Sequence, residues 1–166
     1  MDNDRGAWLE NAMDRWETSL MRMCYAYLGD VLLAEDAVQE TFLKAWKAYD
    51  RFRGEADEKT WLMRIAINNC KDMRRGAWFR HTDFSAALDG LPEGWASFTA
   101  RDDTVTRAVM RLPPRLREAV LLHWYQGLSG EETAAVLRIS RSAVFNRLKK
   151  ARCLLQKELE GWYHEF

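Results

Sequence analysis

Side chains suited to nucleic-acid binding recur at helical spacing in the middle of the sequence. The set stands at i, i+4, i+7 and i+11 and comprises Arg64, Asn68, Lys71 and Arg75. An α-helix places residues at this spacing on one stripe. Phe52 and Trp61 precede the stripe, and a single strand binds where phosphates meet positive charge and unstacked bases meet aromatic rings. The alternative is that both aromatic residues belong to the core and that the stripe is only solvated.

A second basic set lies near the C-terminus, where residues 141–152 contain no acidic side chain. The candidate contacts in this stretch are Arg141, Ser142, Asn146, Arg147, Lys149 and Lys150. Asparagine can read the edge of adenine, while arginine and lysine read guanine or neutralise phosphates. The set therefore predicts a contact with duplex DNA, against the alternative of a solvated amphipathic helix in an ordinary bundle.

A third cluster is acidic and would repel DNA. Asp36, Gln39 and Glu40 fall on the exposed side of a predicted helix. Such a surface suits a protein partner that carries positive charge. The dipole of any helix also favours acidic residues near its start, so the cluster by itself is weak support for an interface.

The sequence gives no indication of catalysis. It contains no Gly-rich phosphate loop, no His-Glu-x-x-His motif and no Ser/His/Asp framework. The three histidines and three cysteines show no metal-ligand spacing. Cys24 and Cys70 fall on apolar helix faces, where thiols pack as small hydrophobic groups. We therefore expect a protein without enzymatic activity, metal or cofactor.

Helices must position these side chains. Val and Ile together number only 10 of the 166 residues, no segment alternates strictly, and good helix formers dominate, so the predicted fold class is all-α. The N-terminal part is expected to form three helices, at about residues 2–28, 32–49 and 59–78. On the third helix Asn69 faces the apolar side, and we expect it to be a hydrogen-bonded core residue.

Residues 81–103 interrupt the helical pattern. This segment contains one Pro, two Gly and scattered apolar residues without helical period. A stretch of about 23 such residues is longer than a compact domain normally tolerates, so it is predicted to be a linker. The chain is therefore expected to form two small helical domains, residues 1–80 and residues 104–166.

The second domain contains a predicted helix-turn-helix. Two helices are expected at about residues 104–112 and 115–126, and the glycine after them ends the second. Ser129 and Glu132 match a capping box that starts a short helix, and Ser140 is the expected N-cap of the last, basic helix. A short helix, a three-residue turn and a basic helix form the arrangement in which the second helix enters the DNA major groove.

The zero net charge conceals a gradient along the chain. Residues 1–50 carry 5 basic and 10 acidic side chains, residues 51–100 carry 8 and 7, and residues 101–166 carry 12 and 8. The longest uncharged run has 12 residues, which is too short for a membrane span of about 20. With an acidic N-terminus unlike a signal peptide and widely separated cysteines, we expect a reduced, cytoplasmic protein.

Three blocks in order resemble the extracytoplasmic-function (ECF) sigma factors, the compact bacterial class that directs RNA polymerase to promoters. Leu33–Lys47 resembles the polymerase-binding helix, with its Asp-x-x-Gln-Glu-x-Phe core intact. Phe52–Gly54 followed by Thr60–Asn69 resembles the loop and helix that capture the −10 element. The third block resembles the domain that binds the −35 element. It comprises Leu112-Pro113, Gly127–Ala135 and the terminal basic helix.

The resemblance implies roles for the three sets of side chains. The acidic cluster would contact the β′ clamp of core RNA polymerase, whose β subunit is a further expected partner. Phe52 and Asn68 would form a pocket for a flipped −10 base, with Lys71 and Arg75 holding the adjacent strand. The resemblance also implies promoter DNA as a partner and an anti-sigma protein that covers these surfaces.

The sequence departs from the family pattern at the start of the basic helix. Phe145 stands where a Lys or Arg is usual, and Arg141 stands where an acidic residue is frequent. Phe145 could contact a thymine methyl group or pack against its own domain. Two other hypotheses remain at this point. One is a stand-alone helix-turn-helix repressor or activator, with residues 1–80 as a sensor or dimerisation bundle. The other is a helical adaptor without a DNA role.

Overall fold

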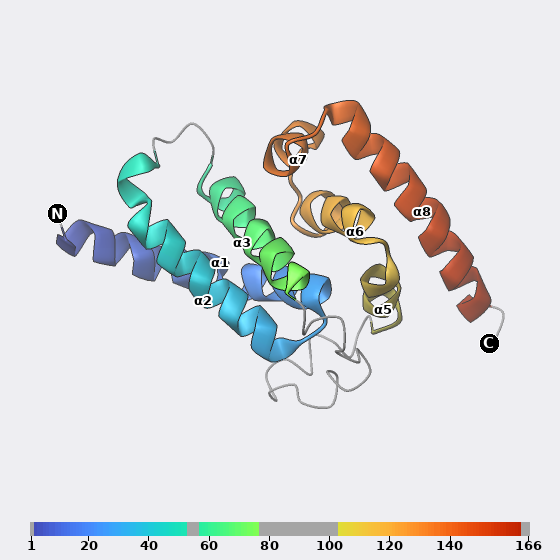
Figure 1. Cartoon of the computed structure of the whole chain (residues 1–166), viewed down its shortest axis with the longest axis horizontal. Coiled ribbons are helices and arrows are strands. Elements are labelled where there is room, and N and C mark those ends of the chain that lie inside the picture. The colour runs from blue at the N-terminus through green and yellow to red at the C-terminus, as the bar shows by residue number, and fades with distance from the viewer. Residues whose placement is uncertain (1, 53–56, 77–102, 164–166) are drawn as a thin grey trace. The chain divides into compact units, whose positions relative to one another are not determined.

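The structure is a computed structural model that describes residues 2–52, 57–76 and 103–163. The chain divides into two compact units, Met1–Thr82 and Asp83–Phe166, and each is considered by itself. Every element in the described ranges is helical, which confirms the all-α prediction (Figure 1). No helix among these residues is apolar over a stretch long enough to span a membrane.

The N-terminal unit is a bundle of three long helices, α1 (Asp2–Leu28), α2 (Val31–Lys47) and α3 (Glu58–Arg75), with a 3-10 turn at Tyr49–Arg51. Aspartates cap α2 and α3 at their N-termini: Asp30 accepts from the Leu33 amide and Asp57 from the Thr60 amide, at 3.1 and 2.8 Å. The three predicted helices are thus confirmed. The α3 helix ends at Arg75, and Gly76 is its extended C-cap, so the prediction that the helix continues through residue 76 is wrong; residues 77 and 78 of the predicted span lie outside the described residues.

The core of this unit forms where the apolar stripes of α1, α2 and α3 meet. Its largest fully buried side chains are Leu20, Met23, Tyr27, Leu28, Leu62, Met63 and Ile67. Cys24 and Cys70 are also fully buried, as expected of packing residues. A hydrogen bond with Cys24, together with burial, raises the pKa of the Cys70 thiol well above its usual value.

The C-terminal unit contains α5 (Asp103–Arg111), α6 (Pro114–Val120), α7 (Gly130–Leu137) and α8 (Arg141–Tyr163). Pro114 occupies the first turn of α6, where its missing N–H costs nothing. The buried Arg117 donates through Nη2 to the Met110 and Leu112 carbonyls, the latter at 3.0 Å, so it satisfies acceptors at the end of α5. The predicted linker, apart from residue 103, lies outside the described residues.

The helix predicted at residues 115–126 is not α-helical throughout. Its last part, Leu121–Tyr125, winds as a π-helix, in which the Gln126 amide donates to the Leu121 carbonyl at 3.0 Å. The wider turn keeps Leu121 and Leu122 fully buried and turns Trp124 and Tyr125 outward. Gly127, at φ +72°, then ends the segment as predicted.

Candidate nucleic-acid and protein interfaces

One face of α3 carries the predicted basic stripe. Asn68 and Arg75 are exposed, and Arg64 and Lys71 are half-buried. The opposite face, which includes Leu62, Ala66, Ile67 and Cys70, is fully buried. Helical geometry therefore brings the four predicted side chains to the surface together, because the apolar positions between them hold the helix on α1 and α2.

The aromatic pair beside this stripe forms a small stacked surface. The Phe52 and Trp61 rings lie 4.6 Å apart between centroids with an interplanar angle of 24°. Both residues are half-buried. Trp61 also stands seven residues before Asn68, so two helical turns place the two side chains on the same face of α3.

Sequence reasoning missed the groups that support this surface from α1. The Glu58 carboxylate accepts from both Trp8 Nε1 and Trp16 Nε1, at 2.9 and 2.8 Å. The Trp8 ring lies 6.0 Å from that of Trp61 and 5.0 Å from that of Tyr49. Two indoles thus tie α1 to the first turn of α3. The tryptophans of α1 fit an apolar stripe, and the stripe gives no sign that their N–H groups share one carboxylate.

A buried polar chain joins α2 to α3. Asn69 is 3% exposed, as predicted for a hydrogen-bonded core residue. Its Nδ2 donates to Thr41 Oγ1 at 3.0 Å, and Lys44 Nζ donates to its Oδ1 at 2.6 Å. Thr41 Oγ1 in turn donates to the Ala37 carbonyl at 2.6 Å. Adjacent asparagines therefore differ completely: Asn68 faces solvent and Asn69 faces the core.

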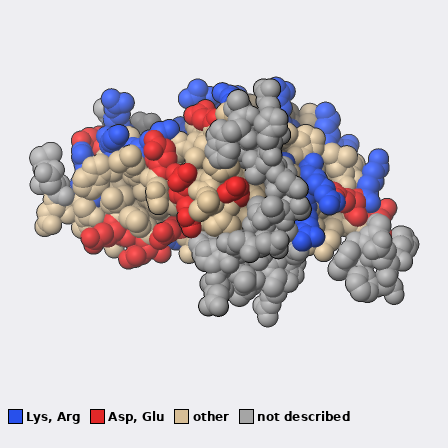
Figure 2. Space-filling view, turned by 60° about the horizontal axis from the view of Figure 1, so that its bottom comes forward, with Lys and Arg blue, Asp and Glu red and all other residues tan. Residues whose placement is uncertain are grey.

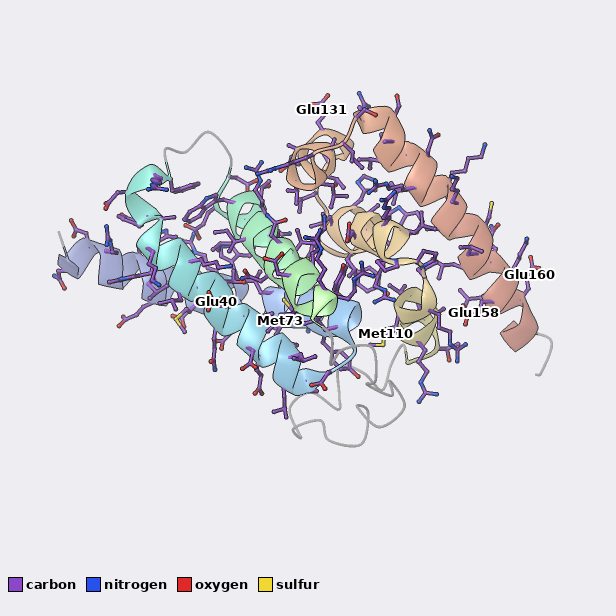
Figure 3. The ribbon with its side chains drawn as sticks, viewed as in Figure 1. Glu40, Met73, Met110, Glu131, Glu158 and Glu160 are labelled. Atoms are coloured by element: carbon purple, nitrogen blue, oxygen red, sulfur yellow. The ribbon has the colours of Figure 1, made fainter. Side chains whose placement is uncertain are left out.

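The exposed face of α2 combines acidic and apolar groups. Asp36, Gln39 and Glu40 are exposed, and Glu40 projects midway along the helix (Figure 3). Leu32 and Leu43, at 72% and 47% exposed, extend the same stripe at its two ends. Neither leucine was predicted from the sequence to belong to an interface, although both stand at helical spacing from the acidic cluster.

An open apolar hollow adjoins this face and is lined by Leu9, Phe42, Leu43 and Trp46. Acidic side chains gather over the surface of the N-terminal helices (Figure 2). A face with apolar groups beside charged ones suits a protein partner, because the apolar area gains from burial and the charges select a basic surface.

The helix-turn-helix of the C-terminal unit has the predicted caps. Ser129 Oγ accepts from the Glu132 amide at 3.0 Å, and the Glu132 carboxylate accepts from the Ser129 amide at 3.1 Å, completing the capping box. Ser140 Oγ accepts from the Ala143 amide at 3.0 Å. Between α7 and α8, Arg138 takes the left-handed conformation at φ +56°. Three residues therefore join α7 to α8, and the two helices pack on each other.

The outward face of α8 carries the predicted DNA-binding side chains. Arg141, Ser142, Asn146, Lys149 and Lys150 are exposed, and Arg147 is half-buried. The inward face, with Val144, Leu148 and Ala151 buried, packs on α6 and α7. Arg141 also lies 3.7 Å from Glu131 of α7, whose position Figure 3 shows.

Phe145 lies at the border between the outward and inward faces of α8. Its ring packs on Gly130 and His123, yet the residue remains 43% exposed.

In the described ranges, no group of three or more His, Cys, Asp or Glu side chains is placed to hold a metal ion.

Comparisons with known proteins agree with the geometry of both units. Residues 12–80 match the family Sigma-70 region 2, and residues 102–155 match Sigma-70 region 4. The RNA polymerase sigma-H factor of Pseudomonas aeruginosa is 31% identical, over 91% of this chain and 86% of its own. The ECF RNA polymerase sigma-E factor of Escherichia coli is 33% identical, over 82% of this chain and 77% of its own.

Solved structures are similar as well. CnrH, in a structure described as its complex with the cytosolic domain of CnrY, has a TM-score of 0.71 and 28% identity, covering 92% of this chain and 88% of that one. The sigma factor RpoE of Bartonella quintana, described in complex with the anti-sigma factor NepR, has a TM-score of 0.73. At 24% identity, with 91% and 96% of the two chains covered, it supports the fold.

Proposed function

Because this chain belongs to the ECF sigma factors, we propose how its surfaces divide the work of an initiation factor that directs RNA polymerase to promoters. Residues 1–80 bind core polymerase and the −10 element, residues 104–166 bind the −35 element, and residues 81–103 join them. Family membership replaces the hypotheses of a stand-alone repressor and of an adaptor. Sigma factors are transcription factors, and the proposed activity is promoter recognition and strand opening without catalysis.

One observation carries this proposal: the acidic and basic side chains occupy separate helix faces. The exposed face of α2 presents Asp36, Gln39 and Glu40, whereas α3 and α8 present the basic sets. DNA phosphates favour the basic faces and are repelled by the acidic one. We therefore assign the α2 face to the β′ clamp of core polymerase, with Leu32 and Leu43 adding apolar contacts at its ends.

The α3 face is assigned to the non-duplex −10 element. The stacked pair of Phe52 and Trp61 offers a flat surface to an unstacked base, and Asn68 offers an amide to its edge. Arg64, Lys71 and Arg75 supply charge for the adjacent phosphates. Extruding a base costs a few kcal/mol, so a stacking surface and a hydrogen-bonding amide on the same helix face are what strand opening requires.

The α8 face is assigned to the −35 element in duplex form. Its N-terminal turns carry Ser142 and Asn146 between basic residues, which suits base edges flanked by phosphates in the major groove. A protein that occludes the acidic α2 face would keep the chain from polymerase. We therefore infer an anti-sigma partner, an inference supported by the similarity to CnrH and its described complex with CnrY.

In vitro transcription tests the proposal. Core polymerase is incubated with a library of randomised promoters, with and without this chain, and transcript starts are mapped. We expect specific starts that depend on the chain and share −10 and −35 sequences. If no promoter in the library gives a chain-dependent start, the proposed function is wrong. Binding of the free chain to duplex DNA should be weak, whereas tight binding without polymerase would indicate a repressor.

A further inference from the structure

At its start, the side of α8 that is proposed to face DNA carries a large apolar side chain among polar ones. Phe145 lies one helical turn after Arg141 and directly before Asn146, both of which are exposed. At 43% exposed, Phe145 leaves much of its ring in contact with water. An exposed phenylalanine loses the free energy that its burial would contribute, so burial against a bound partner would recover it.

The protein fixes the position of this ring. A Cβ atom at residue 130 would lie 2.8 Å from both Cε2 and Cζ of Phe145, so only glycine leaves room for that edge of the ring. His123 meets the ring edge-on, with centroids 5.9 Å apart and an interplanar angle of 77°. Contacts from α7 and from the π-helical segment therefore fix the ring, while the residue as a whole remains 43% exposed.

A guanidinium group lies over the ring of Phe145. The Cζ atom of Arg141 lies 5.6 Å from the centroid of Phe145, which is within cation–π range, and the same side chain pairs with Glu131. An apolar surface and a fork of N–H donors therefore lie next to each other at the start of α8. In the major groove, the group that an apolar surface recognises is the 5-methyl group of thymine.

We propose that Phe145 contacts the 5-methyl group of a thymine in the −35 element and so helps to determine which promoters this chain selects. The inference rests on the proposed role of α8 in −35 binding. It assigns to Phe145 a specificity role that the basic and amide residues of the same face cannot fill, because they recognise hydrogen-bonding groups that thymine and uracil share.

Replacing thymine by deoxyuridine tests this contact, because it removes the methyl group and leaves every hydrogen-bonding group in place. Holoenzyme is assembled from the chain and core polymerase, and a promoter is taken from the library selection. Each −35 thymine on either strand is replaced in turn, and holoenzyme affinity is measured by competition. We expect one position at which the replacement weakens binding about three- to tenfold, the effect of one buried methyl group.

Two variants assign that effect to Phe145. Phe145→Ala removes the ring, and we expect it to bind the thymine and uracil promoters equally. Gly130→Ala keeps the ring but displaces it, since the added Cβ would overlap its edge while alanine suits the first turn of α7. We expect this variant to fold and to change the ratio between the affinities of the holoenzyme for the thymine and uracil promoters. The control is Asn146→Ala, which should weaken binding to both promoters and leave the ratio of the two affinities unchanged.

The outcomes separate this inference from the proposed function. If no chain-dependent promoter is found, both are wrong. If promoters are used but no −35 thymine is sensitive to loss of its methyl group, the proposed function stands and the Phe145 contact is refuted. It is also refuted if Phe145→Ala shows the same sensitivity as the unaltered chain, because another side chain would then read the methyl group.

Discussion

The adjacent asparagines of α3 give the sharpest test of how the N-terminal unit works. Asn68 and Asn69 have the same chemistry and helical environment, but one faces solvent and the other lies 3% exposed between α2 and α3. Replacing each by alanine should therefore separate function from stability. Asn68→Ala should impair strand opening in a fully folded chain, and Asn69→Ala should destabilise the unit.

The contacts set the size of the second effect. Asn69→Ala removes a buried hydrogen bond to Thr41, worth about 1 kcal/mol, and one from the Lys44 ammonium. The Lys44 side chain is 47% exposed, so water can replace the Asn69 oxygen as the acceptor of its hydrogen bond. The loss of this hydrogen bond therefore also costs only about 1 kcal/mol. The space left by the amide adds about 1 kcal/mol, and the better helix propensity of alanine returns about 0.5 kcal/mol. The free energy of unfolding should fall by about 2–3 kcal/mol.

Asn68 is exposed on the surface of α3, so Asn68→Ala should lose no buried contact and should raise the free energy of unfolding by about 0.5 kcal/mol at most, through the better helix propensity of alanine. The loss of one hydrogen bond to a flipped base should slow opening about tenfold. Urea unfolding followed by circular dichroism measures the first quantity. Fluorescence of 2-aminopurine in the −10 element measures the second, and competition for core polymerase serves as the control.

Two results would contradict these assignments. If Asn68→Ala lowers affinity for core polymerase as much as it slows opening, Asn68 does not act on the −10 strand. If Asn69→Ala unfolds at the same urea concentration as the unaltered chain, the buried hydrogen bonds between α2 and α3 do not contribute to stability.

Three further changes have expected outcomes. Replacing Gln39 and Glu40 together by alanine should weaken core polymerase binding about tenfold in a fluorescence titration, at unchanged unfolding free energy; full affinity would exclude this face. Arg138→Gly should raise the unfolding free energy of the C-terminal unit by about 0.5–1 kcal/mol in urea, since glycine adopts φ +56° without strain. The raised pKa of the Cys70 thiol means that the folded state retains a proton the unfolded chain loses above about pH 8.5. The free energy of unfolding should therefore fall as the pH rises above that value. This fall should be steeper in the unaltered chain than in Cys70→Ala, by up to about 1.4 kcal/mol per pH unit.

Periodicity in the sequence was enough to predict most of the fold. The apolar stripes predicted the long helices α1, α2, α3 and α8, because burying one face of each helix contributes most of the stability of a bundle. The capping box at Ser129 and the cap at Ser140 were predictable because they depend only on neighbouring residues. The π-helical turn at Leu121–Tyr125 was not, since a change from i+4 to i+5 bonding depends on packing around the turn.

The candidate sites divide in the same way. A helical wheel identifies the exposed side chains of α2, α3 and α8, since exposure follows from spacing. It cannot identify Glu58 as the shared acceptor of Trp8 and Trp16, because those contacts cross 50 and 42 residues of chain. The positions of such partners depend on how the helices pack, and no local pattern records them.

The contacts of Asn69 join α2, which is proposed to face polymerase, to α3, which is proposed to face the promoter. Lys44 and Thr41 belong to α2 and Asn69 belongs to α3, so two hydrogen bonds fix the rotation of one helix relative to the other. Apolar packing alone tolerates small rotations at little cost, whereas a buried amide loses its partners when a helix turns. In the proposed complex, a clamp that holds the acidic face of α2 would therefore also fix the direction in which Asn68 points. If the two assignments hold, the polar residue in the core is therefore expected to link polymerase binding on α2 to the orientation of the side chains proposed to capture the −10 base.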